Sequence, residues 1–182
     1  MVIFKVLPLL LVAAGFACAG EVNQLGSNKV GKPFPDHTGF DVMHPKDDLV
    51  SPSEMLKGRS VKYVFLSFFQ TTCESCEIEI KQLQAQKARL HQKGVEVLLV
   101  GVKEEPAALR RMVQKYKWDF PVMADRFDGD YSHQCGVFDK KEELILPTAV
   151  LLSRSPKGAM ILDAAWQGGE KDIVGQILEK AK

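Results

Sequence analysis

The segment Val61–Phe69 (VKYVFLSFF) most constrains how this chain folds, because it is an almost unbroken run of apolar, β-branched and aromatic residues. Such a run is typical of a strand that is buried on both faces of a sheet. The residues that follow predict a long amphipathic helix over Glu74–Lys93, which ends at Gly94. One stripe of this helix is apolar at 3.6-residue spacing: Cys76, Ile80, Leu83 and Leu90.

The remaining apolar segments extend this pair into an alternation of strands and helices. Val95–Val102 (VEVLLVGV) predicts a second buried strand, and Pro106 begins a second helix that reaches about Lys117. The later pattern predicts an extended piece, two strands joined by a turn, and a C-terminal helix: Phe120–Met123, Leu146–Leu152, Ala159–Trp166 and Glu170–Lys182. A strand-helix-strand crossover makes the first two strands parallel, and a hairpin adds antiparallel ones. We therefore expect an α/β domain with a central mixed sheet flanked by helices.

The N-terminal segments contribute little to this alternation. Residues 21–45 are rich in Gly, Pro, Asn and Asp, which indicates turns and short extended pieces. Ser51-Pro52 predicts the start of a very short helix, which Gly58 ends.

The first residues instead have the pattern of an export signal. A lysine precedes the apolar run Val6–Ala17, which is shorter than the about 20 residues of a membrane-spanning helix and is followed by small residues. We expect residues 1–19 to be a signal peptide, cleaved after Ala19, and residues 20–182 to form the domain. Two alternatives remain: a lipoprotein signal that ends at Ala17, with a lipid anchor on Cys18, and an uncleaved anchor. All three predict a periplasmic or other extracytoplasmic location, with membrane contact only through this segment.

Charge and cysteine content narrow the classes of function. The 182 residues include 24 Lys+Arg and 23 Asp+Glu, so the formal net charge is +1, which argues against a nucleic-acid-binding protein. The four cysteines are too few for a disulfide scaffold and enough for a redox site. Loss of Cys18 with the signal would leave Cys73, Cys76 and Cys135, an odd number in an oxidising compartment.

Two of these residues form a C-x-x-C motif, Cys73-Glu74-Ser75-Cys76, where the buried strand ends and the helix begins. Thiols at this spacing lie about one helical turn apart, which is close enough for a disulfide. The helix N-terminus stabilises a thiolate at Cys73, the attacking species, whereas Cys76 on the apolar stripe is shielded. We interpret the motif as a redox pair with Cys76 as the resolving thiol. A structural disulfide and half of a zinc site remain open, although the loop is short and no second C-x-x-C is present.

The strand and motif together, VFLSFFQTTCESC over Val64–Cys76, resemble the active-site region of the TlpA/ResA-like thioredoxin family. These are exported thiol–disulfide oxidoreductases of the AhpC/TSA-type thioredoxin superfamily. Leu146–Leu152 (LPTAVLL) is similar to the family's cis-proline strand, and the resemblance covers about Gly31–Lys182. It implies a thioredoxin fold, protein thiol and disulfide substrates, a membrane thiol reductase as electron donor, and no cofactor or resident metal. It also implies a reducing role, for example toward the haem-site cysteines of apocytochrome c.

The resemblance further implies which residues serve the reaction. Pro147 would be cis and lie against the cysteine pair, and the main chain of Leu146 would pair with bound substrate. Glu74 and Thr72, on either side of the first cysteine, are expected to contact the substrate. The acid at Glu74 disfavours the neighbouring thiolate, which would make the pair more reducing. Two departures stand out: Thr72 replaces the usual Trp, and Ser75 replaces a frequent Pro.

Two alternative functions remain open from the sequence. His133 and Cys135 could join the redox cysteines in a copper site, as in Sco-type copper proteins, although those have three residues between their cysteines. Otherwise Cys135 is expected to be a buried apolar residue. A thioredoxin-fold peroxidase is the second alternative, but Gln70 and Leu66 stand where its motif requires Thr or Ser and Pro. The stretch Asp139–Glu143 is expected to be a solvated loop near the substrate groove.

Overall fold

The centre of the molecule is a six-stranded mixed sheet, seen in a computed structural model that describes residues 20–44, 49–126, 128–169 and 171–181. The predicted signal segment lies outside these residues. In spatial order the strands are β1 (Gly20–Val22), β10 (Met160–Gln167), β9 (Thr148–Arg154), β6 (Tyr63–Phe69), β7 (Val95–Val102) and β8 (Val122–Asp125). The pairs β6–β7 and β7–β8 are parallel, and the others are antiparallel. The predicted α/β fold with a central mixed sheet is therefore confirmed.

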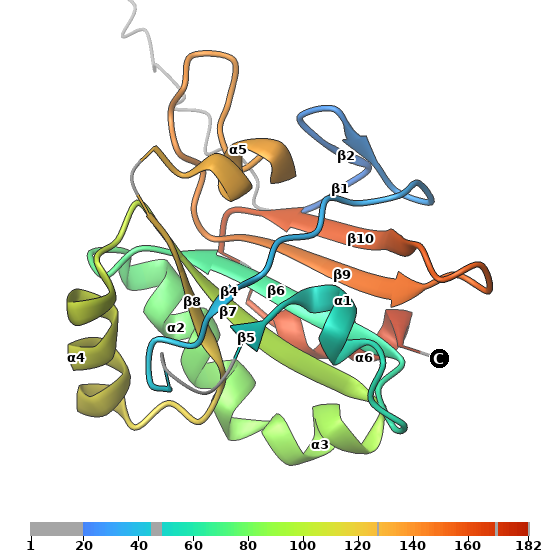
Figure 1. Cartoon of the computed structure of the whole chain (residues 1–182), viewed down its shortest axis with the longest axis horizontal. Coiled ribbons are helices and arrows are strands. Elements are labelled where there is room, and N and C mark those ends of the chain that lie inside the picture. The colour runs from blue at the N-terminus through green and yellow to red at the C-terminus, as the bar shows by residue number, and fades with distance from the viewer. Residues whose placement is uncertain (1–19, 45–48, 127, 170, 182) are drawn as a thin grey trace, which may run out of the picture.

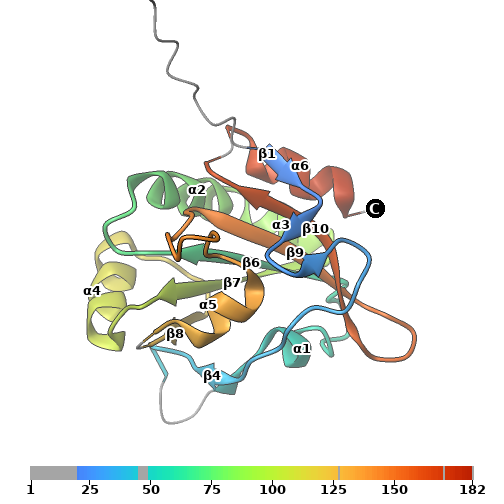
Figure 2. The same cartoon turned by 90° about the horizontal axis from the view of Figure 1, so that it is seen from above.

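Helices cover both faces of this sheet (Figures 1 and 2). Those on one face are α2 (Glu74–Ala85), α3 (Lys87–Gln92), α4 (Pro106–Tyr116) and α6 (Ile173–Lys180). The opposite face carries two short helices, α1 (Pro52–Met55) and α5 (Asp130–Cys135). Two small hairpins complete the fold, β2 (Gln24–Leu25) with β3 (Asn28–Lys29) and β4 (Gly39–Phe40) with β5 (Leu49–Val50).

Strand β6 shows why the sequence folds into two layers of core. Alternate side chains of a strand point to opposite faces. Val64, Leu66 and Phe68 are fully buried on the face that carries α1 and α5. Phe65 and Phe69 are fully buried on the face that carries α2, α3, α4 and α6. Because both faces need apolar side chains, the strand reads as a continuous apolar run rather than an alternating one.

Several predicted elements have bounds shifted by a few residues, such as the C-terminal helix, which begins at Ile173, and three differences are larger. The single helix predicted over Glu74–Lys93 is broken at Gln86, whose N–H is shared between the carbonyls of Gln82 and Leu83. No Pro or Gly marks this break in the sequence. Helix α5 was not predicted, and β1 was expected only as part of an irregular segment, yet it pairs with the edge of β10.

The parallel strands determine where a site can form. The carboxyl ends of β6 and β7 meet at one edge of the sheet, so the residues that follow each strand lie close together there. Gln70–Cys73 follows β6, and Lys103–Glu105 follows β7. The C-x-x-C motif therefore occupies the edge at which α/β sheets commonly bind their ligands.

Candidate redox site

The C-x-x-C motif forms a disulfide at the N-terminus of α2. The two Sγ atoms are 2.05 Å apart, and the two Cα atoms are 5.3 Å apart. Cys73 is the N-cap residue of α2, and its Sγ accepts a hydrogen bond of 3.2 Å from the backbone N–H of Cys76. The sulfur of Cys73 thus occupies the position where unpaired N–H groups of the helix stabilise negative charge.

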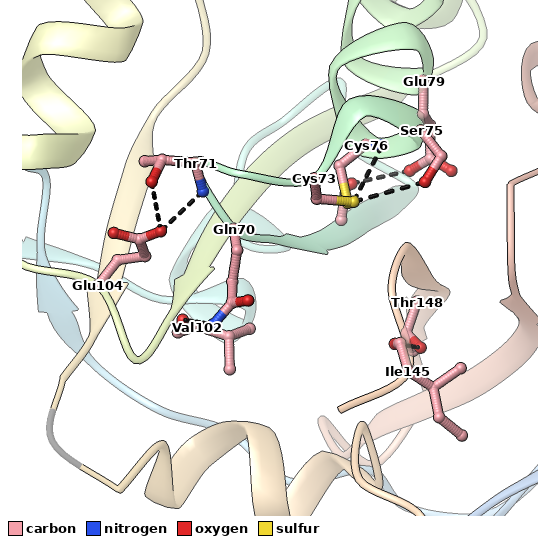
Figure 3. The surroundings of a disulfide bond; sticks show 11 residues. Gln70, Thr71, Cys73, Ser75, Cys76, Glu79, Val102, Glu104, Ile145 and Thr148 are labelled. Carbon is pink, nitrogen blue, oxygen red and sulfur yellow. Dashed lines mark hydrogen bonds between the residues drawn. A yellow bond between two sulfur atoms is a disulfide. The ribbon is translucent and has the colours of Figure 1, made fainter. Parts of the chain in front are cut away.

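A second donor reaches the same sulfur atom. The Ser75 hydroxyl lies 3.5 Å from Cys73 Sγ, and because a disulfide sulfur carries no hydrogen, the hydroxyl is the donor (Figure 3). Two groups of the first helical turn therefore point hydrogen atoms at Cys73.

The two cysteines differ sharply in exposure to solvent. Cys76 is 0% exposed and belongs to the core beneath α2, whereas Cys73 is partly exposed. Its neighbours Thr72, Glu74 and Ser75 are all exposed. An incoming disulfide can consequently reach Cys73 but not Cys76.

The turn before β9 contains the cis peptide bond Leu146–Pro147, so the conformation expected of Pro147 is confirmed. The hydroxyl of Thr148 closes this turn by donating a hydrogen bond of 2.6 Å to the carbonyl of Ile145 (Figure 3). Gly169 lies between this turn and the C-x-x-C motif. A Cβ atom placed on this glycine would lie 3.4 Å from the Cβ of Ser75 and 4.0 Å from Cγ of Pro147.

A buried carboxylate lies behind the pair, on the same face of α2 as Cys76. Glu79 is 3% exposed, and its Oε1 accepts a hydrogen bond of 2.8 Å from the hydroxyl of Ser67 on β6. Neither residue was predicted from the sequence to belong to the site. Their signal was a lone serine inside a buried strand and an acid three residues after Cys76, a spacing that keeps both on one helix face.

A second carboxylate contacts the turn that precedes Cys73, and it was also not identified from the sequence. Glu104 follows β7, and its Oε1 accepts hydrogen bonds of 2.7 Å from both the backbone N–H and the hydroxyl of Thr71. The adjacent Gln70 donates from Nε2 to the carbonyl of Val102 at 3.1 Å. The turn before the motif is therefore tied to β7 by side chains at two successive positions (Figure 3).

The structure separates the third cysteine from the redox pair. Cys135 is buried as expected, and burial raises the pKa of its thiol well above the ordinary range. His133 is exposed, stacks on Phe138 and lies 3.4 Å from a carboxylate oxygen of Glu142. Within the part of the chain that the structure describes, no three His, Cys, Asp or Glu side chains are grouped so that they could hold a metal ion. The copper-site hypothesis thus finds no ligand set among these residues.

The stretch Asp139–Glu143 forms a turn whose residues 140–143 are exposed, as expected. Asp139 closes it by accepting hydrogen bonds from the N–H groups of Lys141 and Glu143.

None of the helices in the described ranges is both long enough and apolar enough to cross a membrane.

A disulfide of this kind, mounted where β6 meets α2 and faced by a cis-proline turn, can exchange electrons with other thiols and disulfides. The class of protein that this fold and site define is the thiol–disulfide oxidoreductase. Comparison with known sequences gives the family: the pattern of the AhpC/TSA family matches residues 30–157, and the chain belongs to that family.

Curated relatives give a narrower placement. The chain is 28% identical over 158 residues to the thiol-disulfide oxidoreductase ResA of Bacillus cereus strain ATCC 10987, covering 85% of this chain and 83% of that protein. It is 30% identical over 127 residues to ResA of Bacillus cereus strain ZK, covering 68% and 69%. The resemblance to the TlpA/ResA-like proteins is confirmed, and with it the assignment as a thioredoxin-like thiol–disulfide oxidoreductase.

Solved structures agree on the fold. A putative thiol:disulfide interchange protein DsbE from Chlorobium tepidum superposes with a TM-score of 0.65 at 20% identity, covering 86% of this chain and all of that one. The peroxidoxin BcpB from Mycobacterium tuberculosis superposes with a TM-score of 0.67 at 14% identity, covering 85% and 96%. At these identities the likeness shows a shared thioredoxin fold and nothing about the reaction.

Proposed function

We propose that this oxidoreductase is exported and works as a reductant of protein disulfides, with haem-site cysteines of apocytochrome c as one candidate substrate. The observation that carries the thiol–disulfide exchange itself is the unequal exposure of the pair. Cys73 is accessible at a helix N-terminus, and Cys76 is completely buried behind it. This is the arrangement expected of an attacking and a resolving thiol.

The reaction starts from the dithiol form. The Cys73 thiolate attacks one sulfur of the substrate disulfide, which forms a mixed disulfide and releases the other substrate sulfur as a thiolate that takes up a proton. The thiol of Cys76 then loses its proton and attacks Cys73 Sγ, which expels the second substrate thiolate. The substrate gains two electrons and two protons, and the protein ends with the Cys73–Cys76 disulfide. A membrane thiol reductase would return two electrons to this disulfide.

The substrate would lie against the cis-proline turn and the residues around Cys73. Among the described residues, Leu146 takes part in no main-chain hydrogen bond, so its N–H and C=O can pair with an extended substrate segment. Thr72 and Glu74 flank the attacking sulfur and are exposed. A shallow cavity of about 330 Å³ adjoins the motif beside Ser75, and the exposed Ile78 lines it. An apolar substrate side chain next to the target cysteine would fit there.

The test combines variants with a measured potential. The reduced wild-type protein should reduce a peptide that carries an intramolecular C-x-x-C-H disulfide, Cys73→Ser should be inactive, and Cys76→Ser should accumulate the mixed disulfide. The potential of the pair, measured against glutathione, should lie nearer that of thioredoxin, about −270 mV, than that of DsbA, about −120 mV. An active Cys73→Ser variant would overturn the assignment of the attacking thiol. A potential near that of DsbA would overturn the direction of electron flow.

Export is tested separately. Cleavage after Ala19 would keep the whole described range of strand β1, Gly20–Val22. Mass spectrometry of the N-terminus in the host should find Gly20 as the first residue. An acylated Cys18 would support the lipoprotein alternative, and an intact Met1 in the cytosolic fraction would contradict export.

A further inference from the structure

Glu104 contacts the redox site through the turn that delivers Cys73 to the helix. The turn is closed by a hydrogen bond of 3.1 Å from the N–H of Cys73 to the carbonyl of Gln70. Thr71 is its second residue, and both polar hydrogens of Thr71 point to one oxygen atom of Glu104 at 2.7 Å. Hydrogen bonds to an ionised carboxylate are stronger than hydrogen bonds between two neutral groups.

The backbone that brings Glu104 to this place is itself unusual. Lys103, the preceding residue, has a φ of 55°, which lies in the left-handed region that side chains other than Gly rarely adopt. Its N–H donates a hydrogen bond of 2.7 Å to the carbonyl of Asp125, which holds the bend against β8. Unfavourable backbone conformations of this kind persist where the surrounding structure requires them, often at functional sites.

We propose that Glu104 is a positioning residue of the redox reaction: it clamps Thr71 and thereby fixes the Cys73 sulfur at the N-terminus of α2. The proposal rests on the proposed function. Cys73 depends on this placement because its Sγ accepts the N–H of Cys76, one of the free donors of the first helical turn. A looser turn would let the sulfur leave this position, and its thiolate would lose stabilisation.

The carboxylate also carries a charge, and the two effects have opposite signs. A negative charge near Cys73 disfavours the thiolate, whereas the clamp favours it. Glutamine separates them, because both hydrogen bonds end on the same atom, Oε1, and a glutamine carbonyl oxygen can accept both. Glu104→Gln therefore keeps the clamp and removes the charge, while Glu104→Ala removes both.

The experiment follows the reaction of the reduced protein with a small aromatic disulfide as a function of pH. Small disulfides react with Cys73 alone. The midpoint of the pH profile therefore gives the pKa of the Cys73 thiol, and the plateau rate shows how well the thiolate is placed for attack. We expect Glu104→Ala to react about tenfold more slowly near neutral pH than Glu104→Gln, with a midpoint at higher pH. Glu104→Gln should react as fast as wild type or faster. Thr71→Val, which loses one of the two hydrogen bonds, should fall between them.

Two controls make the result decisive. Glu105→Ala changes an exposed neighbour whose side chain makes no capping hydrogen bond to α4, and it should match wild type. Thermal unfolding of each variant shows whether a slow reaction reflects misfolding, and Thr71→Val provides the test if Glu104→Ala does not fold. Equal rates and midpoints for the Ala and Gln variants would overturn the clamp. If the wild type does not react, the proposed function is overturned instead. The same holds if the Cys73→Ser variant reacts as fast as a reactive wild type.

Discussion

Replacing Ser75 by alanine tests how the motif of this chain controls its own reactivity. The serine stands where many members of the family have proline, which carries neither a hydroxyl nor a backbone N–H. Here the hydroxyl lies 3.5 Å from Cys73 Sγ, in addition to the Cys76 N–H at 3.2 Å. After reduction the sulfur becomes a thiolate, which is a far stronger acceptor than the disulfide. The hydroxyl should therefore stabilise the reduced form more than the oxidised form.

The size of the effect follows from the geometry. A hydrogen bond to a charged group contributes about 1.5–3 kcal/mol when it is well formed. Ser75 is exposed and its contact is long, so water replaces part of the lost interaction and about 1 kcal/mol remains. Since 1.36 kcal/mol corresponds to one pKa unit, the Cys73 thiol pKa should rise by about 0.7. At a pH where Cys73 is ionised, the reduced form loses the same free energy, and the reduction potential should become about 20 mV more negative.

The thiolate is measured by its ultraviolet absorbance during a pH titration, and the potential by equilibration with glutathione. Ser75→Thr is the matched control, because it keeps a hydroxyl at the same position and should retain the wild-type pKa and potential. A Ser75→Ala variant whose pKa falls or does not change would refute the reasoning. The same holds if the Thr variant shifts as far as the Ala variant.

Two further predictions concern a buried thiol and a half-buried carboxyl group outside the motif. Because burial raises the pKa of the Cys135 thiol, iodoacetamide should leave Cys135 unmodified in a folded variant that lacks the redox pair, and should modify it after denaturation; labelling is read by mass spectrometry. Burial also raises the pKa of Asp163, whose Oδ2 is one of the buried atoms without a hydrogen-bond partner in the described part of the chain. A raised folded-state pKa means that the folded state favours the protonated carboxyl group. The protein therefore loses folding stability as the pH rises through that pKa. Asp163→Asn should therefore raise the Tm by about 1–3 °C at neutral pH, and leave it unchanged below the ordinary aspartate pKa of about 3.9, in paired thermal melts. A higher Tm at both pH values would point to a cause other than ionisation.

Local sequence patterns predicted the fold where one rule acted alone. The strand Val95–Val102 has the predicted bounds, because a short apolar run rich in β-branched residues between Gly94 and a polar loop is typical of a buried strand. Gly94 itself has a φ of 76°, the conformation that ends a helix and that glycine adopts without strain. The placement of Cys73 as an N-cap followed from the same kind of rule, since a motif between a buried strand and an amphipathic helix begins that helix.

Contacts between segments that are far apart in the sequence could not be predicted from local patterns. Glu104 and Thr71 are 33 residues apart, and their contact depends on the parallel pairing of β6 with β7 and on the left-handed bend at Lys103. A charged residue after a strand is ordinarily a solvated loop residue, so nothing in the sequence distinguished this one. The cis conformation of Pro147 came from family resemblance for the same reason. A single X-Pro bond is normally trans unless tertiary packing selects the other isomer.

The departures from the family pattern and the hydrogen bonds found at the site belong together. Tryptophan before the first cysteine and proline before the second restrict a site through bulk and through a fixed φ. This chain has Thr72 and Ser75 at those positions, and neither residue supplies such restriction. Its active-site turn is held instead by polar contacts, from Glu104 to Thr71 on one side of Cys73 and from Ser75 on the other. Polar contacts respond to charge and to the redox state of the sulfur, which apolar packing does not. The position of the Cys73 sulfur in this chain should thus differ between the oxidised and the reduced pair.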